Sequence, residues 1–198
     1  MQTNTFKLFV FFTILLTFVG VYQANAQSKK DKFIVVLDAG HGGHDPGKHA
    51  KSGLKEKDIA LKVVLGIGAI LDKQPDIKVV YTRKTDVFVN LYKRGKIAND
   101  NNADLFISVH CDAFTNPDAY GAGVYVMGMS KLKANMDIAM KENAVIYLED
   151  DYKENYDGFD PKSPESYIGL TLMQEEYLDQ SILLADFIQK EYTGTLKR

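Results

Sequence analysis

Three short apolar runs separated by two helical stretches constrain the fold of this 198-residue chain more than any other feature. Phe33–Leu37 is a continuous apolar run, which is typical of a strand buried on both faces. Ile77–Tyr81 is predicted as a second strand and Leu105–Val109 as a third, buried strand. The helical stretches begin near Glu56, ending before Gln74-Pro75, and at Leu91, with Asn90 as the expected N-cap. Strands that alternate with helices predict an α/β fold, with a mainly parallel twisted sheet and helices on both faces. The three runs are Phe33–Leu37, Ile77–Tyr81 and Leu105–Val109.

The second half of the chain is less regular. A fourth strand is predicted at Val124–Met127, between glycines. A charged segment from about 129 to 168 comes next, and the apolar spacing from Leu132 to Leu148 predicts one amphipathic helix within it. The pattern at Leu170–Tyr192 predicts a longer helix. We treat the segment at about 129–168 as an insertion into the main domain.

The N-terminus predicts export. Lys7, the apolar run of residues 8–22 and Ala24-Asn25-Ala26 have the pattern of a signal peptide spanning residues 1–26. The run is short for a bilayer-spanning helix. We therefore expect a secreted domain at 32–198, periplasmic or in the cell envelope, with no stable membrane anchor. A formal net charge of −2 lacks the excess of basic charge that is typical of proteins that bind nucleic acid. The single cysteine, Cys111, cannot form an intramolecular disulfide.

Two histidines come directly after predicted strands or close to their ends. His41 lies in a glycine-rich loop after the first strand, and His110 directly follows the third. Ligands of such sheets bind beyond the carboxyl ends of the strands, so both imidazoles are expected at one rim. Glu56, at the start of a helix, can return a carboxylate to that rim, although Asp58 could do so equally well. Two histidines and one carboxylate are a donor set typical of a hydrolytic zinc site.

Other chemistries fit less well. His44 and His49 are expected to do no more than cap turns, and Cys111 to be a small buried hydrophobe. A Cys-His hydrolase needs a base beside the thiolate, but His110 would point to the opposite face of a continuing strand. The loop 40–47 lacks the third glycine of a dinucleotide motif and the Gly-Lys-Ser/Thr of a P-loop.

Taken in order, several motifs resemble those of the zinc-dependent N-acetylmuramoyl-L-alanine amidases, the amidase-3 family. They cover roughly residues 33–127. The resemblance implies a phosphorylase/hydrolase-like α/β fold and Zn²⁺ held by His41, Glu56 and His110, with Glu56 preferred over Asp58. The motifs are Val36 to Gly47, Glu56-Lys57-Asp58, Thr82 to Asp86 with Leu91 and Arg94, and Ala98-Asn99 with Ala103 to His110.

The resemblance also implies a reaction, which is hydrolysis of the amide between N-acetylmuramic acid and L-alanine in peptidoglycan. A second carboxylate, on a late strand of the family, would move the proton. Nothing after Gly128 matches that strand, so we nominate no catalytic base in 1–198. We expect a C-terminally incomplete domain that lacks the family's last strand and helix, binds zinc and turns over slowly.

Several expectations remain open. The insertion at 129–168 is expected to be a lid or docking helix that restricts substrate access, with a solvated surface excursion as the alternative. A regulatory partner is possible but unidentified. Two other functions compete with the amidase. One is a zinc-binding cell-wall protein with little or no turnover, and the other is a zinc peptidase acting on stem-peptide bonds.

Overall fold

The computed structural model describes residues 32–50, 52–112, 116, 118–126, 133–156, 160 and 177–197. The chain divides into two units, Met1–Lys32 and Phe33–Arg198. The predicted signal peptide lies outside the described residues, and every described helix and strand belongs to the second unit. These elements are β1 (Phe33–Ala39), α2 (Glu56–Leu71), β2 (Ile77–Tyr81), α3 (Leu91–Asp100), β3 (Leu105–Val109), α4 (Lys133–Asn143), the 3-10 helix η1 (Ala144–Leu148), α5 (Tyr152–Asn155) and α7 (Leu178–Gly194).

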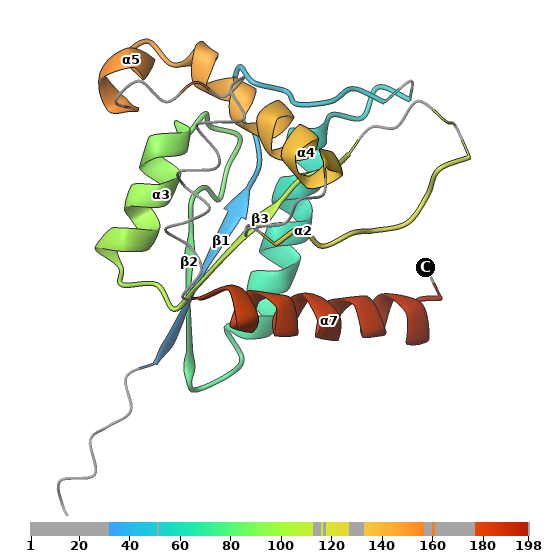
Figure 1. The fold of residues 1–198 in the computed structure, drawn as a ribbon. Coiled ribbons are helices and arrows are strands. Elements are labelled where there is room, and N and C mark those ends of the chain that lie inside the picture. Colours follow the sequence, from blue (N-terminus) through green and yellow to red (C-terminus); the bar gives the residue numbers. More distant parts are fainter. Residues whose placement is uncertain are drawn as a thin grey trace, which may run out of the picture. The chain divides into compact units, whose positions relative to one another are not determined.

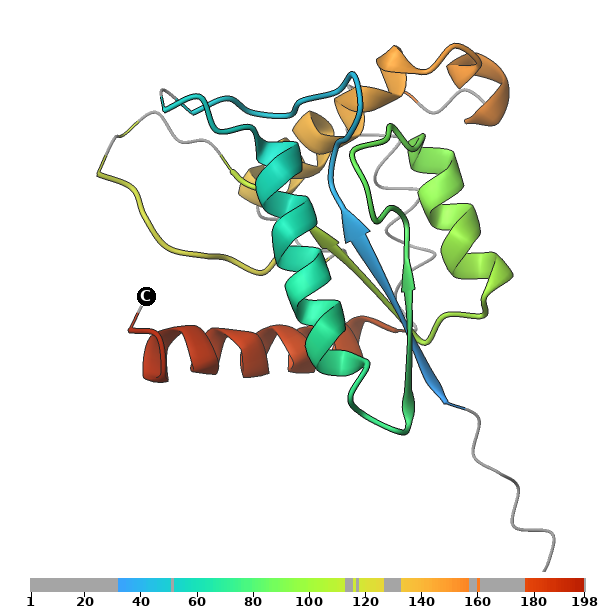
Figure 2. The same cartoon turned by 180° about the vertical axis from the view of Figure 1, so that it is seen from behind.

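The sheet has the order β2-β1-β3, and β1 runs parallel to both neighbours. Val36 pairs with Val80 of β2 on one side and with Phe106 of β3 on the other. The chain crosses from β1 to β2 through α2 and returns past β1 to β3 through α3. Right-handed crossovers in opposite directions place their helices on opposite faces. Accordingly, α2 and α3 cover the two faces of the sheet (Figure 1 and Figure 2), and the predicted α/β class is confirmed.

Alternation along β1 divides its side chains between the two faces. Val35, Leu37 and Ala39 point toward α2 and pack with Ala60 and Val64 in the apolar core. The intervening positions, including Asp38, point toward the α3 face, where Asp38 meets a side chain of that helix. Burial on both faces explains why β1 is almost wholly apolar. Asp38 is the exception, and it lies at the carboxyl end beside the candidate site.

Some predictions need correction. Residues 124–126 form no strand, so the prediction at Val124–Met127 is wrong for those residues, while Met127 lies outside the described part. The strand β3 is only partly buried, and Phe106 is exposed, so the prediction of a buried strand is wrong. Among the described residues β3 pairs with β1 alone. Asn90 occupies the N-cap position of α3, but its side chain makes no capping hydrogen bond.

The second half of the chain keeps its predicted helical character with altered bounds. The single helix expected from Leu132 to Leu148 is divided into α4 and the 3-10 helix η1. The helix predicted at Leu170–Tyr192 appears as α7, while residues 170–176 lie outside the described part. Within the described part of the chain, no helix is both long and apolar enough to span a membrane.

Two glycines of α2 test the packing of this helix on the sheet. A Cβ at Gly68 would collide with the Tyr81 hydroxyl and lie 2.5 Å from Tyr81 Cζ, whereas a Cβ at Gly66 would meet nothing within 4 Å. We expect Gly68→Ala to lower the free energy of unfolding by about 1–3 kcal/mol through overpacking. Gly66→Ala should raise it by about 0.5–1 kcal/mol, because alanine is the better helix former. Urea unfolding of both variants measures this, and equal effects would show that α2 does not pack on Tyr81 as described.

Candidate metal centre

Three side chains predicted to share the rim of the sheet do converge. His41 follows β1, His110 follows β3, and Glu56 is the first residue of α2. Glu56 Oε1 lies 3.2 Å from His41 Nε2 and 3.2 Å from His110 Nδ1. Gly40 makes the approach possible, since a Cβ there would lie 2.5 Å from the His110 ring. The three residues therefore stand together at the rim, as their positions at strand and helix ends predict.

A fourth donor, which the sequence did not predict, comes from the insertion. Glu142, near the end of α4, places Oε2 2.8 Å from His110 Nδ1 and 3.5 Å from His41 Nε2. The four side chains each offer one ligand atom, and these atoms all lie within 4.8 Å of one another. No sequence signal marks Glu142, because it stands on an ordinary charged amphipathic helix, whereas the family motif predicts a glutamate on a buried strand.

The orientation of His41 is the observation that favours a cation here. Its Nδ1 lies 2.8 Å from Asp45 Oδ2, so the proton on Nδ1 is donated to that carboxylate. Among the described residues, His41 Nε2 is buried without a hydrogen-bond partner, and it faces Glu56 and Glu142. A lone pair aimed at two carboxylates is unfavourable unless a positive ion or a proton lies between them.

The spacing also suits a small metal ion. Four donors placed tetrahedrally at zinc-like bond lengths are separated by about 3.3–3.5 Å. The four histidine–carboxylate separations run from 2.8 to 3.5 Å, and all four ligand atoms lie within 4.8 Å of one another. Two imidazoles with two carboxylates are a donor set that a divalent ion accepts, so these residues fit a metal.

The site is strongly anionic around its imidazoles. Burial lowers the pKa of His41, but the hydrogen bond to Asp45 and the close carboxylates of Glu142 and Glu56 outweigh it and raise that pKa to about 11. For His110, burial is likewise outweighed by the two glutamates, and the pKa rises to about 9. Burial raises the pKa of Glu142, but the two histidines more than reverse this and lower it to about 2. The carboxylates therefore stay ionised and attract any positive charge.

Glu56 is fixed by backbone amides as well as by the imidazoles. Its carboxylate accepts from Lys48 N at 2.9 Å and from Cys111 N at 2.7 Å, and it is almost fully buried. Burial acts to raise its pKa, but two imidazoles and two backbone amides hold the pKa well below the usual range. Asp58, the other carboxylate considered for this place, is exposed. The geometry thus selects Glu56 of the pair.

Two buried arginines hold the backbone that carries His41. Arg83 donates to the carbonyls of Ala39 and Gly40 at 2.9 and 2.8 Å. Arg94 donates to the carbonyls of Ala39 and His41 at 2.7 and 2.8 Å. His41 has φ 59, a conformation uncommon outside glycine, and the guanidinium on its carbonyl helps to hold it there. The arginine motifs of the sequence are thus structural supports of the site.

Below this loop lies a buried carboxylate, Asp38. Its Oδ1 accepts from Thr82 Oγ1 at 2.6 Å and from Arg94 Nη1 at 2.7 Å, and its Oδ2 accepts from Ser108 Oγ at 2.6 Å. The first partner follows β2, the second lies on α3 and the third lies on β3. One side chain therefore joins three elements directly beneath the metal centre.

The remaining candidates lie outside the cluster, although Cys111 is only partly buried rather than the buried hydrophobe predicted, and the described contacts of His44 and His49 include no turn cap. His44 packs on the ring of Phe88, with centroids 4.1 Å apart, and His49 forms a backbone bridge with Lys55. Burial raises the pKa of the Cys111 thiol, which opposes thiolate formation. Neither histidine belongs to the four-residue cluster.

Comparison with known proteins identifies the family of this chain. Residues 35–198 match the protein family described as N-acetylmuramoyl-L-alanine amidase (Amidase_3), and the chain belongs to that family.

Two curated relatives illustrate the extent of the similarity. The N-acetylmuramoyl-L-alanine amidase AmiA of Escherichia coli strain K12 is 41% identical over 114 residues, which are 58% of this chain and 39% of AmiA. A probable N-acetylmuramoyl-L-alanine amidase, AmiB of Haemophilus influenzae, is 32% identical over 166 residues, covering 81% of this chain and 34% of that protein. This chain thus spans less than two fifths of the length of either relative.

Solved structures of amidases are also similar. The N-acetylmuramoyl-L-alanine amidase AmiC2 of Nostoc punctiforme matches with 33% sequence identity and a TM-score of 0.47, over 62% of this chain and 65% of that one.

Asp45 offers a test of the site that leaves all four donor side chains in place. We expect Asp45→Asn to weaken the affinity for a divalent metal ion by about 10–100-fold, because His41 loses the carboxylate that orients its ring. Competition with a chromophoric chelator measures the affinity. Asp58→Asn, which changes an exposed carboxylate two residues after Glu56, is the matched control and should leave the affinity unchanged. If both variants bind alike, Asp45 does not orient a metal ligand.

Proposed function

We propose that the chain is an exported zinc amidase that cleaves the bond between N-acetylmuramic acid and L-alanine in peptidoglycan. Membership of the amidase family supports the reaction and the substrate. The N-terminal pattern at residues 1–26 supports export to the periplasm or cell envelope. The observation that carries the proposal is the buried His41 Nε2, which lacks a hydrogen-bond partner among the described residues and faces two carboxylates.

In this proposal His41, Glu56 and His110 hold the zinc. Zinc in such a site lowers the pKa of water and polarises a carbonyl group. The protein's own part is to keep the donors in place. Asp45 fixes the ring of His41, and the amides of Lys48 and Cys111 fix Glu56. Preorganised donors of this kind avoid the cost of rearrangement during the reaction.

We further propose that Glu142 closes the site in the resting protein. A catalytic zinc keeps one position free for water and substrate. Glu142 Oε2 lies 2.8 and 3.5 Å from the two imidazole nitrogens, and Glu56 Oε1 lies 3.2 Å from each. The two carboxylates therefore stand equally close to the imidazoles, with no room for a water between Glu142 and the other donors. The insertion, proposed at about 129–168, thus acts as a lid that supplies a fourth donor.

A different role for Glu142 is the proton acceptor that the sequence did not reveal. A general base must stand within hydrogen-bond reach of the reacting water rather than in its place. The close approach of Glu142 to both imidazoles favours the closing role. The closing role also offers a physical reason for slow turnover. The zinc-binding wall protein of the alternative would then be an active enzyme in its closed state.

The two roles predict opposite results for Glu142→Ala. Removing a closing carboxylate should raise the rate of stem-peptide release from purified peptidoglycan about tenfold or more, since a charge-assisted contact of about 1.5–3 kcal/mol is lost. Removing a general base should lower the rate by typically 10²–10⁴-fold. The zinc-loaded chain is assayed by mass spectrometry of the released peptides, with Glu154→Gln, which changes an exposed glutamate of the same segment, as the control.

The products decide between reaction classes. An amidase frees stem peptides that begin at L-alanine, whereas a peptidase cuts within the stem. His110→Ala should abolish release, and added chelator should do the same. Stem peptides cut internally, or release that survives loss of His110, would contradict the proposal.

A further inference from the structure

The N-terminus of α3 is capped by residues of the insertion. The first amide groups of a helix lack partners within the helix, and Asn90 supplies none from its side chain. Leu91 N instead donates to Glu149 Oε1 at 2.7 Å, and Tyr92 N donates to Tyr156 Oη at 2.7 Å. A carboxylate also suits the positive end of the helix dipole. The insertion is therefore joined to the helix that carries Arg94.

The two capping side chains also bind each other. Tyr156 Oη donates to the Glu149 carboxylate, lying 2.9 Å from both of its oxygens. Glu149 is 3% exposed, so it is a buried carboxylate whose described partners are one hydroxyl and one backbone amide. Burial and the neighbouring Glu149 raise the pKa of Tyr156, which keeps the hydroxyl proton in place for donation. Loss of the Tyr156 hydroxyl leaves the buried Glu149 carboxylate with Leu91 N as its one described partner.

Glu149 and Glu142 are connected by one short, partly buried segment. α4 ends at Asn143, and η1 runs directly on from Ala144 to Leu148. Ile146, in the middle of η1, is 2% exposed and anchors this segment by its apolar side chain. The segment thus begins with Glu142, whose carboxylate lies in the metal centre, and ends with Glu149, whose carboxylate binds the N-terminus of α3.

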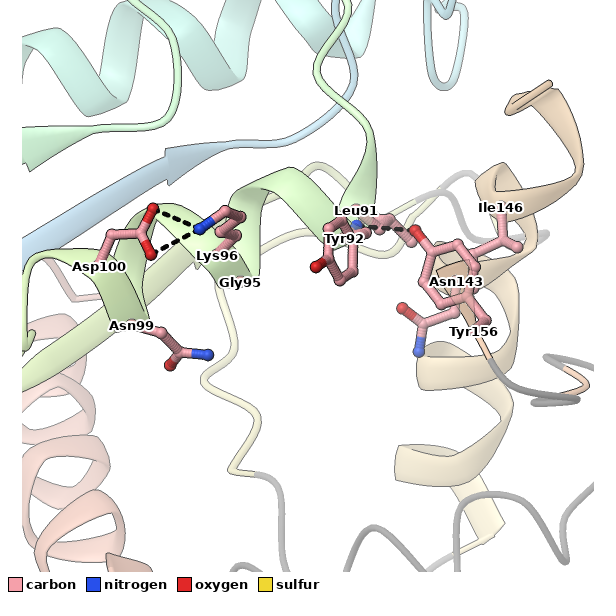
Figure 3. Close-up of a pocket in the computed structure, with 9 residues that line it drawn as sticks. All are labelled: Leu91, Tyr92, Gly95, Lys96, Asn99, Asp100, Asn143, Ile146 and Tyr156. Carbon is pink, nitrogen blue, oxygen red and sulfur yellow. Dashed lines mark hydrogen bonds and ion pairs between the residues drawn. The ribbon is translucent and has the colours of Figure 1, made fainter. Parts of the chain in front are cut away.

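Between α3 and this segment the packing is open. A hollow of about 570 Å³ is lined by Leu91, Gly95 and Asn99 of α3 and by Asn143, Ile146 and Tyr156 of the insertion. Figure 3 shows the bond from Tyr92 to Tyr156 at one end of this hollow, while Lys96 pairs with Asp100 within α3 at the other. Because the hollow replaces close packing, the attachment depends heavily on the Glu149 and Tyr156 contacts.

We propose that Glu149 and Tyr156 form a latch that holds Glu142 in the metal centre. When these two side chains lose their contacts with α3, Glu142 leaves the metal centre and the site opens. Both are positioning residues, since neither touches the four donor side chains. The inference rests on the proposed closing role of Glu142 and adds the contact that controls it.

The test compares Tyr156→Phe with Tyr92→Phe in the full chain. Tyr156→Phe removes the hydroxyl that joins Glu149 to the Tyr92 amide, whereas Tyr92→Phe keeps that amide and changes a half-exposed ring. We expect Tyr156→Phe to speed amide hydrogen exchange in residues 142–149 and at Leu91 and Tyr92 about tenfold or more. Zinc extraction by a chelator and stem-peptide release should accelerate as well, and Tyr92→Phe should change none of these.

A second background separates the latch from the closing role itself. In Glu142→Ala protein, adding Tyr156→Phe should give no further gain in release, because the donor that the latch positions is gone. If Glu142→Ala activates but Tyr156→Phe alters neither exchange nor release, the latch is wrong and the closing role stands. If Glu142→Ala does not activate, the closing role is wrong whatever Tyr156 does. Should Tyr156→Phe fail to fold, Glu149→Gln with Glu154→Gln as its control carries the same test.

Discussion

The ion pair of Asp38 and Arg94, buried at the carboxyl end of the central strand, is the interaction on which the rest of the site depends. Asp38 also accepts the hydroxyl protons of Thr82 and Ser108, so it links the end of β1 to both neighbouring strands. The Arg94 guanidinium then continues to the carbonyls of Ala39 and His41. A buried pair broken on one side typically costs about 3–5 kcal/mol. A substitution of Asp38 or Arg94 should therefore disturb both the sheet and the backbone that carries His41.

Electrostatics connects this base to the insertion, which contributes Glu142. Glu56 comes from the base and is held by backbone amides, whereas Glu142 comes from the insertion. Both carboxylates approach the same two imidazoles, and their charges are compatible only with a positive charge between them. The fourth donor therefore serves two purposes. In the proposed centre it would act as a ligand of the cation, and it attaches the insertion to the site, so the position of the insertion would control access to the metal.

The sequence predicted the sheet and its rim well and the role of the insertion poorly, for physical reasons. Periodicity located β1, α2, β2, α3 and β3, and strand ends of a parallel sheet meet at one rim, so His41 and His110 could be placed together from the sequence. The choice of Glu56 over Asp58 came from the family resemblance. Glu142 and Glu149 could not, because their roles depend on where a charged helix docks rather than on local pattern. Asn90 was expected to cap α3 from its residue type alone, but the carboxylate of Glu149, 58 residues after Leu91, does so. The segment at 124–126 had strand composition but lacks strand pairing.

The most direct test of the closed metal centre is to identify the side chains that bind the metal in the resting protein. A crystal structure of the zinc-loaded chain, with anomalous data at the zinc edge, identifies the ion and its donors. We predict zinc bound to His41 Nε2, His110 Nδ1, Glu56 and Glu142, at about 2.0–2.2 Å. Zinc elsewhere, or zinc on the first three residues with Glu142 withdrawn and water in its place, would contradict the closed centre.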